Sequence, residues 1–249
     1  MAKVLPKGDK YKQAKVLQMQ TLADKILAYY RQLKPTWQLP AGWQLLYPFV
    51  HKATWRAMEA FYHKYYDDCA PRTLLFGINP GRFGAGVTGI AFTDPIRLEQ
   101  VCGIDNQFEK KPELSSIFIY EVIEQMGGPD HFFSKYFITS VCPLGFLHNG
   151  VNANYYDDSQ LLETIRPHIR RHIQDQIVLF GTTSAAVSIG QGTNYKFFKK
   201  ANQQHRWFEQ IWPLPHPRWV MQYRHKQKAH FLTMYRECLH RAHVHNLVI

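Results

Sequence analysis

A glycine-rich segment over residues 77–86, with the sequence GINPGRFGAG, is the part of this chain best suited to hold a small ligand. Glycine lets the backbone approach a ligand closely or adopt positive φ angles. The spacing fits neither the GxGxxG pattern of dinucleotide-binding folds nor a Walker A loop, which argues against a dinucleotide or a nucleoside triphosphate. Asn79 carries both a donor and an acceptor and could hold a water molecule or the polar edge of a base. Taken alone, an asparagine before a proline is more typical of a turn.

His216 is the second candidate, and it lies between Pro215 and Pro217 on stiff backbone. A rigidly held imidazole can direct an N–H group at negative charge that develops on a leaving group. Because the chain has 13 histidines, a surface role is the simpler interpretation of His216 by itself. A polar amide and a rigid imidazole, each following a predicted strand, together favour a functional site.

The chain of 249 residues has 30 Lys and Arg against 19 Asp and Glu, which is a net charge of +11. This excess predicts either a well-solvated surface or a polyanionic partner such as nucleic acid, and charge alone does not choose between them. Cations and aromatic residues alternate after His216, as expected where a helix start meets a phosphate backbone. The residues expected to contact DNA in this stretch are Arg218, Trp219, Arg224, His225 and Lys226.

Four short apolar runs predict strands over residues 73–77, 136–142, 177–181 and 208–212. Helical patterns alternate with them, which predicts a mostly parallel central sheet covered by helices on both faces. We therefore expect an α/β fold that forms a single three-layer domain over residues 1–249, with helices of residues 1–70 packed on it. The helices are expected over residues 12–30, 50–66, 115–126 and 222–240, and from Asp157 or Asp158 to about residue 174 with a kink at Pro167.

Ligands of open parallel sheets bind beyond the carboxyl ends of the strands. The segment after each predicted strand carries glycine, proline or small polar residues, so we expect all four segments to converge on one site. On this basis Thr182 and Ser184, which follow the third predicted strand, are also expected to contact DNA.

The four cysteines, Cys69, Cys102, Cys142 and Cys238, lie far apart and predict neither a disulfide framework nor a zinc or iron–sulfur site. We expect no metal and no cofactor, and we expect Cys102 and Cys142 to be core residues. No apolar run reaches the ~18 residues that a membrane span needs, and residues 1–15 are lysine-rich and unlike a signal peptide. These features predict an intracellular protein, neither secreted nor bound to a membrane, and we expect a monomer.

The glycine-rich segment resembles the uracil-DNA glycosylase superfamily, and within it a divergent branch of the single-strand-selective monofunctional type. GINPG at residues 77–81, with FG at 83–84 and TGIAF at 88–92, is similar to the GMNPGPFG and TGVPFG of that family. CPL at residues 142–144 resembles the exit of its second strand, and His216-Pro217 resembles the start of its HPSPR motif. The resemblance covers about residues 73–225.

This resemblance implies a monofunctional DNA repair enzyme that flips uracil out of DNA and hydrolyses its N-glycosidic bond. Asn79 would position the hydrolytic water, and His216 would stabilise negative charge on uracil O2. The remaining roles that the resemblance implies concern binding. Phe92 would stack on the base, the Ile78 backbone would hold it, and Gly81 would leave room for a 5-substituent, while Arg218 or Trp219 would wedge into the duplex. Phe83 and Phe92 flank the glycine-rich segment, so each is either a core residue or an aromatic that stacks on a base.

Two departures from the family pattern concern selectivity. Ser140 stands where the family has an asparagine that reads the uracil edge, and Arg218-Trp219-Val220 replaces the Ser-Pro-Arg-Asn-Pro run after His216-Pro217. The shorter serine side chain could need a bridging water to reach the base. The range of deaminated bases and the strand preference are therefore left open.

Two functions of other classes also stay open. A metal-dependent nuclease or phosphoesterase would use Asp67-Asp68 or Asp157-Asp158, and insensitivity to EDTA would argue against it. A nucleic-acid-binding protein without catalysis would use the glycine-rich segment to clasp a strand, and formation of abasic sites would exclude it. No lysine is placed to form a Schiff base, so we expect no lyase step.

Overall fold

A four-stranded parallel sheet forms the centre of the computed structural model, which describes residues 20–248. The strands are β2 (Thr73–Gly77), β3 (Tyr136–Ser140), β6 (Ala185–Ile189) and β7 (Gln210–Leu214), in the order β3-β2-β6-β7. Every neighbouring pair is parallel. All residues of β2 and β6 are buried, because both faces of the sheet are covered. The predicted α/β class is confirmed.

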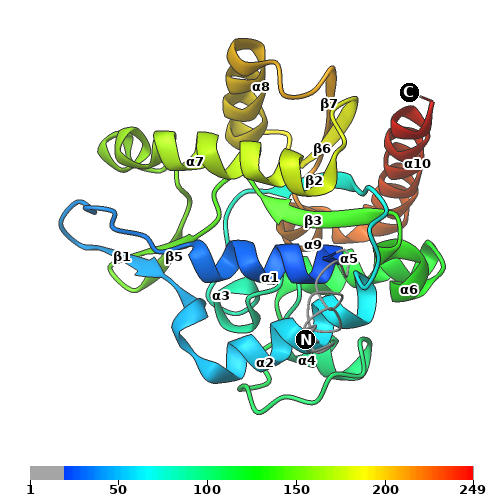
Figure 1. Cartoon of the computed structure of the whole chain (residues 1–249), viewed down its shortest axis with the longest axis horizontal. Coiled ribbons are helices and arrows are strands. Elements are labelled where there is room, and N and C mark those ends of the chain that lie inside the picture. Colours follow the sequence, from blue (N-terminus) through cyan, green and yellow to red (C-terminus); the bar gives the residue numbers. More distant parts are fainter. Residues whose placement is uncertain (1–19, 249) are drawn as a thin grey trace, which may run out of the picture.

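Helices cover the two faces of this sheet (Figure 1). On one face, Phe180 of α7 (Ser159–Phe180) stacks on Phe137 of β3 with ring centroids 4.1 Å apart. Next to it, α8 (Thr193–His205) packs on β6. On the other face, α10 (Lys228–Leu247) lies against β6 and packs on α5 (Leu114–Gln125). Because the strands are parallel, their carboxyl ends all lie at one edge of the sheet, between the two helical layers.

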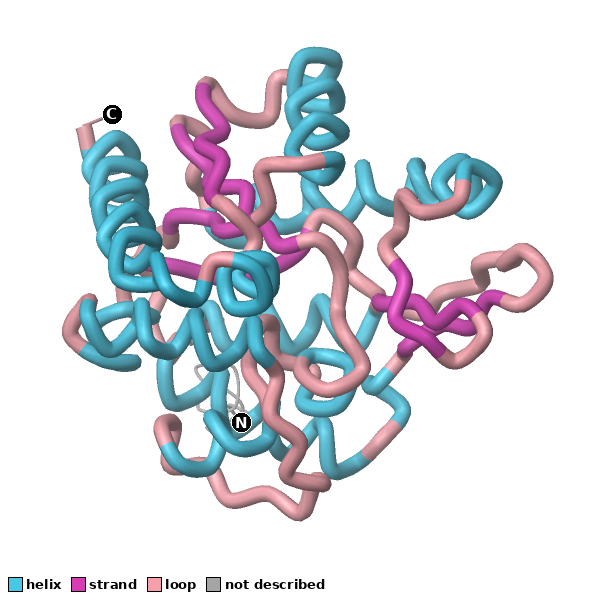
Figure 2. The backbone as a smooth tube through the Cα atoms, turned by 180° about the vertical axis from the view of Figure 1, so that it is seen from behind, coloured by secondary structure: helices cyan, strands magenta, loops and turns pink. Residues whose placement is uncertain are grey.

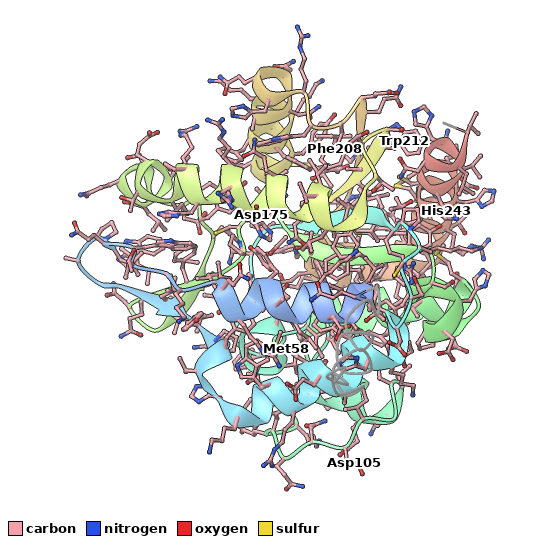
Figure 3. The ribbon with its side chains drawn as sticks, viewed as in Figure 1. Met58, Asp105, Asp175, Phe208, Trp212 and His243 are labelled. Atoms are coloured by element: carbon pink, nitrogen blue, oxygen red, sulfur yellow. The ribbon has the colours of Figure 1, made fainter. Side chains whose placement is uncertain are left out.

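The amino-terminal helices share this core. The first described helix, α1 (Leu22–Gln32), begins with a capping box between Thr21 and Asp24. It packs on α2 (Lys52–Tyr65), which follows a 3₁₀ turn, η2 (Pro48–Val50), along the chain. Met58 lies between the ribbons of α1 and α2 and is fully buried (Figure 3). The part of the predicted first helix over residues 12–19 lies outside the described residues.

A second sheet, which the sequence analysis missed, lies apart from the central one (Figure 2). It is antiparallel and consists of β1 (Trp43–Leu46), β4 (Gly145–His148) and β5 (Val151–Ala153), in the order β1-β4-β5. The β4–β5 turn is Asn149-Gly150, and both residues have positive φ angles, 50° and 77°. Asn-Gly is the sequence signature of such two-residue hairpins, so this signal was present in the sequence.

The predicted strand over residues 177–181 was wrong, because these residues are the last turn of α7 and its cap. Gly181 has a φ of 69°, and its amide donates to the carbonyl of Ile177 at 2.8 Å. Val178 is 84% exposed, whereas Ile173 and Phe180 are buried, which is a helical and not a strand pattern. A short apolar run cannot distinguish a buried strand from a buried helix end. The third strand of the sheet is β6, which begins at Ala185.

The other predicted elements are present with shifted ends. The predicted fourth strand lies two residues later, as β7, and α7 continues through Pro167 to Phe180. In place of one helix over residues 222–240 there are α9 (Pro217–Tyr223), the 3₁₀ turn η3 (His225–Gln227) and α10. Three short helices complete the described chain: α3 (Ala85–Thr88), α4 (Pro95–Gln100) and α6 (Gly128–Phe133). Within the described residues, no helix has the length and apolar composition that crossing a membrane requires.

The end of α7 can be tested with two single substitutions. Gly181→Ala should lower the free energy of unfolding by roughly 1–2 kcal/mol, because a Cβ is strained at this positive φ. Val178→Ala should change it little, because the side chain is in water and alanine favours a helix. Urea unfolding measures both. A loss of about 1.5–3 kcal/mol at Val178 would instead indicate a buried strand.

Candidate active site

A cavity of about 370 Å³ opens at the carboxyl edge of the central sheet. Segments far apart in sequence line it: the exit of β2, Phe92, the exit of β3, residues 152–154 at the end of β5, and the start of α9. Of the four predicted strand exits, those after β2, β3 and β7 converge here, whereas the segment after residues 177–181 does not. After β6, the neighbouring residue is Gly190, where a Cβ would lie 3.8 Å from the His216 ring.

His216 is the N-cap of α9, and its ring faces the cavity. Its Nδ1 accepts a hydrogen bond from the backbone amide of Arg218 at 3.2 Å, so the ring proton is assigned to Nε2. Burial, with a smaller contribution from the nearby Arg218 guanidinium, lowers the pKa of His216 to about 4. At neutral pH the side chain is therefore an uncharged imidazole with an N–H donor available at Nε2.

The amide of Asn79 is held on both sides by backbone. Its Nδ2 donates to the carbonyl of Ala153 at 3.2 Å and to that of Pro80 at 3.3 Å, while its Oδ1 accepts from the amide of Tyr155 at 3.1 Å. These bonds tie the exit of β2 to the connection between β5 and α7. One lone pair of Oδ1 is left to accept a hydrogen bond from a water molecule.

Phe92 forms a wall of the cavity in a strained conformation. Its φ is 52°, which is uncommon for a bulky residue and is found where surrounding structure enforces it. The ring lies against Gly77, where a Cβ would come within 2.7 Å of it, and its centroid is 6.1 Å from that of His216. A flat aromatic face and the His216 imidazole thus border the same space.

Ser140 lines the cavity as an acceptor, because its hydroxyl proton is already used. Its Oγ donates to the carbonyl of Cys142 at 2.7 Å, and its own carbonyl accepts from His172 Nε2 at 2.9 Å. On the other side of the His172 ring, Nδ1 accepts from the hydroxyl of Tyr29 in α1. Burial lowers the pKa of His172 to about 4, which keeps the ring neutral in this role. Helix α1 thereby helps to hold the exit of β3.

The predicted site residues divide into those that line the cavity and those that do not. Phe83 does not: its ring is packed between the Arg82 guanidinium, at 4.6 Å, and the Lys111 ammonium, at 5.7 Å. His225 and Lys226 are exposed in η3, outside the cavity lining. The cavity brings together Ile78, Asn79, Gly81, Phe92, Ser140, His216, Arg218 and Trp219.

The sequence of residues 63–239 matches the model of the uracil DNA glycosylase superfamily. The chain belongs to this superfamily. The crystal structure of wild-type SMUG2 from Pedobacter heparinus matches it with a TM-score of 0.87 and 42% sequence identity, over 90% of this chain and 98% of that chain. No curated protein sequence matches the chain. The predicted family and branch are confirmed, and the protein is a uracil-DNA glycosylase, a DNA repair hydrolase whose partner is DNA.

For two residues of this glycosylase, the predicted contact with DNA was wrong. Thr182 and Ser184 precede β6 instead of following a strand, so they lie at the amino edge of the sheet, opposite the cavity. Both are buried, and the Thr182 hydroxyl donates to the carbonyl of Arg72 at 2.7 Å. The error follows from the misassigned end of α7.

Glu113 supplies a carboxyl group to the glycosylase cavity that was not predicted from the sequence. Glu113, just before α5, lines the cavity beside the glycine-rich segment. A Cβ on Gly81 would lie 2.9 Å from Glu113 Oε1, and one on Gly84 would overlap Oε2. The space beside Gly81, which was expected to admit a 5-substituent of uracil, is therefore bordered by this carboxyl group. Glycines three residues apart indicated a close neighbour, but not which side chain it would be.

Residues 152–154 are the other missed part of the lining. Asn152 Oδ1 accepts from the amide of Arg82 at 3.1 Å, and the carbonyl of Ala153 accepts from Asn79. The Asn-Gly turn before them predicts a hairpin, so this signal could have directed attention to the strand that carries them.

Three of the four carboxylates considered for a nuclease have structural partners. Asp68 pairs with the buried guanidinium of Arg72, Asp157 accepts from the amide of Asn154 at 2.7 Å, and Asp158 caps α7. Among residues 20–248, no three His, Cys, Asp or Glu side chains converge as metal ligands would.

The contact between Gly77 and Phe92 can be tested in the glycosylase. Gly77→Ala should displace the Phe92 ring and lower the single-turnover rate of uracil release by about 10²-fold, as expected for a small misplacement at a reacting centre. The extra methyl group should also cost about 1–3 kcal/mol of stability. Adding Phe92→Leu should restore stability but not activity, because leucine has no stacking face. A wild-type rate for Gly77→Ala would contradict this role.

Proposed function

We propose that the glycosylase hydrolyses the N-glycosidic bond of uracil that has rotated out of DNA into the cavity, without a lyase step. The observation that carries this proposal is the neutral His216 imidazole with its free Nε2–H, facing the same space as the Phe92 ring. The ring face can stack on the base, and the N–H can bond to the oxygen on which charge develops.

In the proposed reaction, the bond between C1′ and N1 breaks and its electron pair leaves with uracil. His216 Nε2–H donates to uracil O2 as negative charge builds up there. Because the imidazole is neutral and fixed by the Arg218 amide, it requires no reorganisation at the moment of reaction. Asn79 Oδ1 holds the water that attacks C1′, and its orientation is set by Ala153 and Tyr155.

Recognition of the base is proposed to use acceptors and backbone at the strand exits. Ser140 Oγ accepts the N3–H of uracil directly or through a water, and the Ile78 backbone holds the base from the exit of β2. A substituent at C5 or another deaminated base would meet the Glu113 carboxyl group beside Gly81. We therefore propose unsubstituted uracil as the main substrate.

DNA is proposed to lie across the mouth of the cavity, at the start of α9. Arg218 and Trp219 line this mouth, and Trp219 is 37% exposed. The guanidinium of Arg224 lies 5.0 Å from the Trp219 ring and supports it. Either Arg218 or Trp219 would fill the space that the flipped base leaves.

The chain is proposed to act as one domain, as a monomer, inside the cell. Its core is continuous from Leu22 to Ala242.

The proposed roles of His216 and Asn79 predict large losses of activity. His216→Ala should lower the single-turnover rate of uracil release by at least about 10²–10³-fold, which is the usual effect of removing one donor to a developing anion. Asn79→Ala should lose a comparable amount. His63→Ala, at an exposed position of α2, is the control and should keep the wild-type rate. Near-wild-type release by either cavity variant would contradict the proposal.

The proposed DNA surface predicts a local salt dependence. Arg218→Ala and Arg224→Ala should each reduce the slope of log affinity against log salt by about 1, as expected for loss of one phosphate contact. Lys52→Ala, at an exposed position of α2, should leave the slope unchanged. Fluorescence anisotropy with an inactive variant measures these slopes. Equal effects at Lys52 and at the two arginines would mean that the charge acts only as a general background.

A further inference from the structure

The backbone of Glu113 is held by a buried carboxylate. Asp94 is fully buried, and its Oδ2 accepts a hydrogen bond from the Glu113 amide at 2.9 Å. The same side chain caps α4 through the amide of Arg97, at 2.8 Å, and pairs with the Arg97 guanidinium at 3.2 Å. Glu113 is therefore presented to the cavity from a fixed position.

The fold itself does not use the Glu113 carboxyl group. Glu113 is the N-cap of α5, yet its side chain makes no capping hydrogen bond. Among the described residues it has neither an ion-pair partner nor a hydrogen-bond donor, although it lines the cavity. Gly81 and Gly84 leave the space that it occupies. An unsatisfied, partly buried carboxyl group of this kind costs stability unless a ligand or water completes it.

Hydrolysis produces a proton that some group must accept. The attacking water loses a proton as its oxygen bonds to C1′. The Asn79 amide is not basic, and Nδ1 of His216 is already bonded to the Arg218 amide. Ser140 Oγ is likewise not a base at neutral pH. Among the residues that line the cavity, Glu113 alone has a carboxyl group.

We propose that Glu113 is the general base of the glycosylase, an inference that rests on the proposed hydrolysis of uracil in this cavity. Its carboxylate takes a proton from the water held at Asn79 while the water oxygen bonds to C1′. The C1′–N1 bond breaks, and its electron pair leaves with uracil, whose O2 accepts from His216. The proton on Glu113 then passes to the uracil anion, so the products are uracil and an abasic sugar.

The surroundings of Glu113 place its ionisation near neutral pH. Burial and, to a lesser degree, the negative charge of Asp94 raise the pKa of Glu113 to about 7, even though the Arg218 guanidinium opposes this rise. The other charged or titratable groups nearby are Arg97, which is paired with Asp94, and neutral His216 on α9. A base must be ionised, so the rate should fall by about tenfold per pH unit below the pKa and level off above it.

Single-turnover kinetics with saturating enzyme on a uracil-containing oligonucleotide test this role, measured from about pH 5 to about pH 9. Glu113→Gln keeps the shape of the side chain but cannot accept the proton. It should lower the plateau rate by about 10²–10⁴-fold and remove the acid limb of the profile. Added formate should partly restore the rate of Glu113→Ala. Glu109→Gln is the matched control, because Glu109 is exposed and pairs with Lys111 at 2.9 Å.

A second measurement does not depend on activity. A raised pKa means that the folded state holds the proton more tightly, so this stabilising effect is complete below the ordinary glutamate pKa and is lost as pH rises through about 7. The wild type should therefore lose stability relative to Glu113→Gln over this range in urea unfolding. Parallel stability curves would overturn the proposal.

The kinetic outcomes separate this inference from the proposed function. If Glu113→Gln keeps the wild-type rate and acid limb while His216→Ala is inactive, Glu113 is not the base. A change only in the choice between uracil and 5-substituted uracil would make Glu113 a wall of the cavity, which also overturns the proposal. If the wild type itself releases no uracil, the proposed function fails, and the inference fails with it.

Discussion

The amide of Asn79 is the connection on which the rest of the cavity depends. It bonds to the backbone of Ala153 and Tyr155 and so fixes the segment at the end of β5 relative to the central sheet. The hydroxyl of Tyr155 continues the network to Asn194 in α8, whose amide reaches the carbonyl of Gly77. A primary amide suits this position because it donates and accepts at once, which a carboxylate cannot do.

Most of the polar side chains around the cavity are uncharged. Burial holds both His172 and His216 in the uncharged form, and each ring uses Nδ1 as an acceptor. An uncharged donor costs less to bury than an imidazolium, and it remains fixed when the leaving group acquires charge. The ionisable acid of the cavity, Glu113, lies near the Arg218 guanidinium, which offsets part of its burial cost.

Local sequence patterns predicted the secondary structure correctly for some segments and wrongly for others. The run over residues 73–77 is β2, with the same ends, and Leu74, Leu75 and Phe76 at its centre are all buried. The run over residues 177–181 looked the same, yet it ends a helix of 22 residues whose buried face continues from Ile165 and Ile169. Whether residues 177–181 form a strand or the end of a helix depends on how the preceding turns of α7 pack against β3, and that packing is a tertiary property.

The sequence by itself indicated the fold class through alternating strand and helix patterns, and the family through the similarity of residues 77–92, 142–144 and 216–217 to its motifs. Asn79, Phe92 and His216 were identified in this way. Only the tertiary structure decided that Glu113 enters the cavity and that Thr182 and Ser184 do not. The physical reason is that a side chain's surroundings depend on which segments pack beside it, and a separation of some 30 residues between Gly81 and Glu113 carries no local signal.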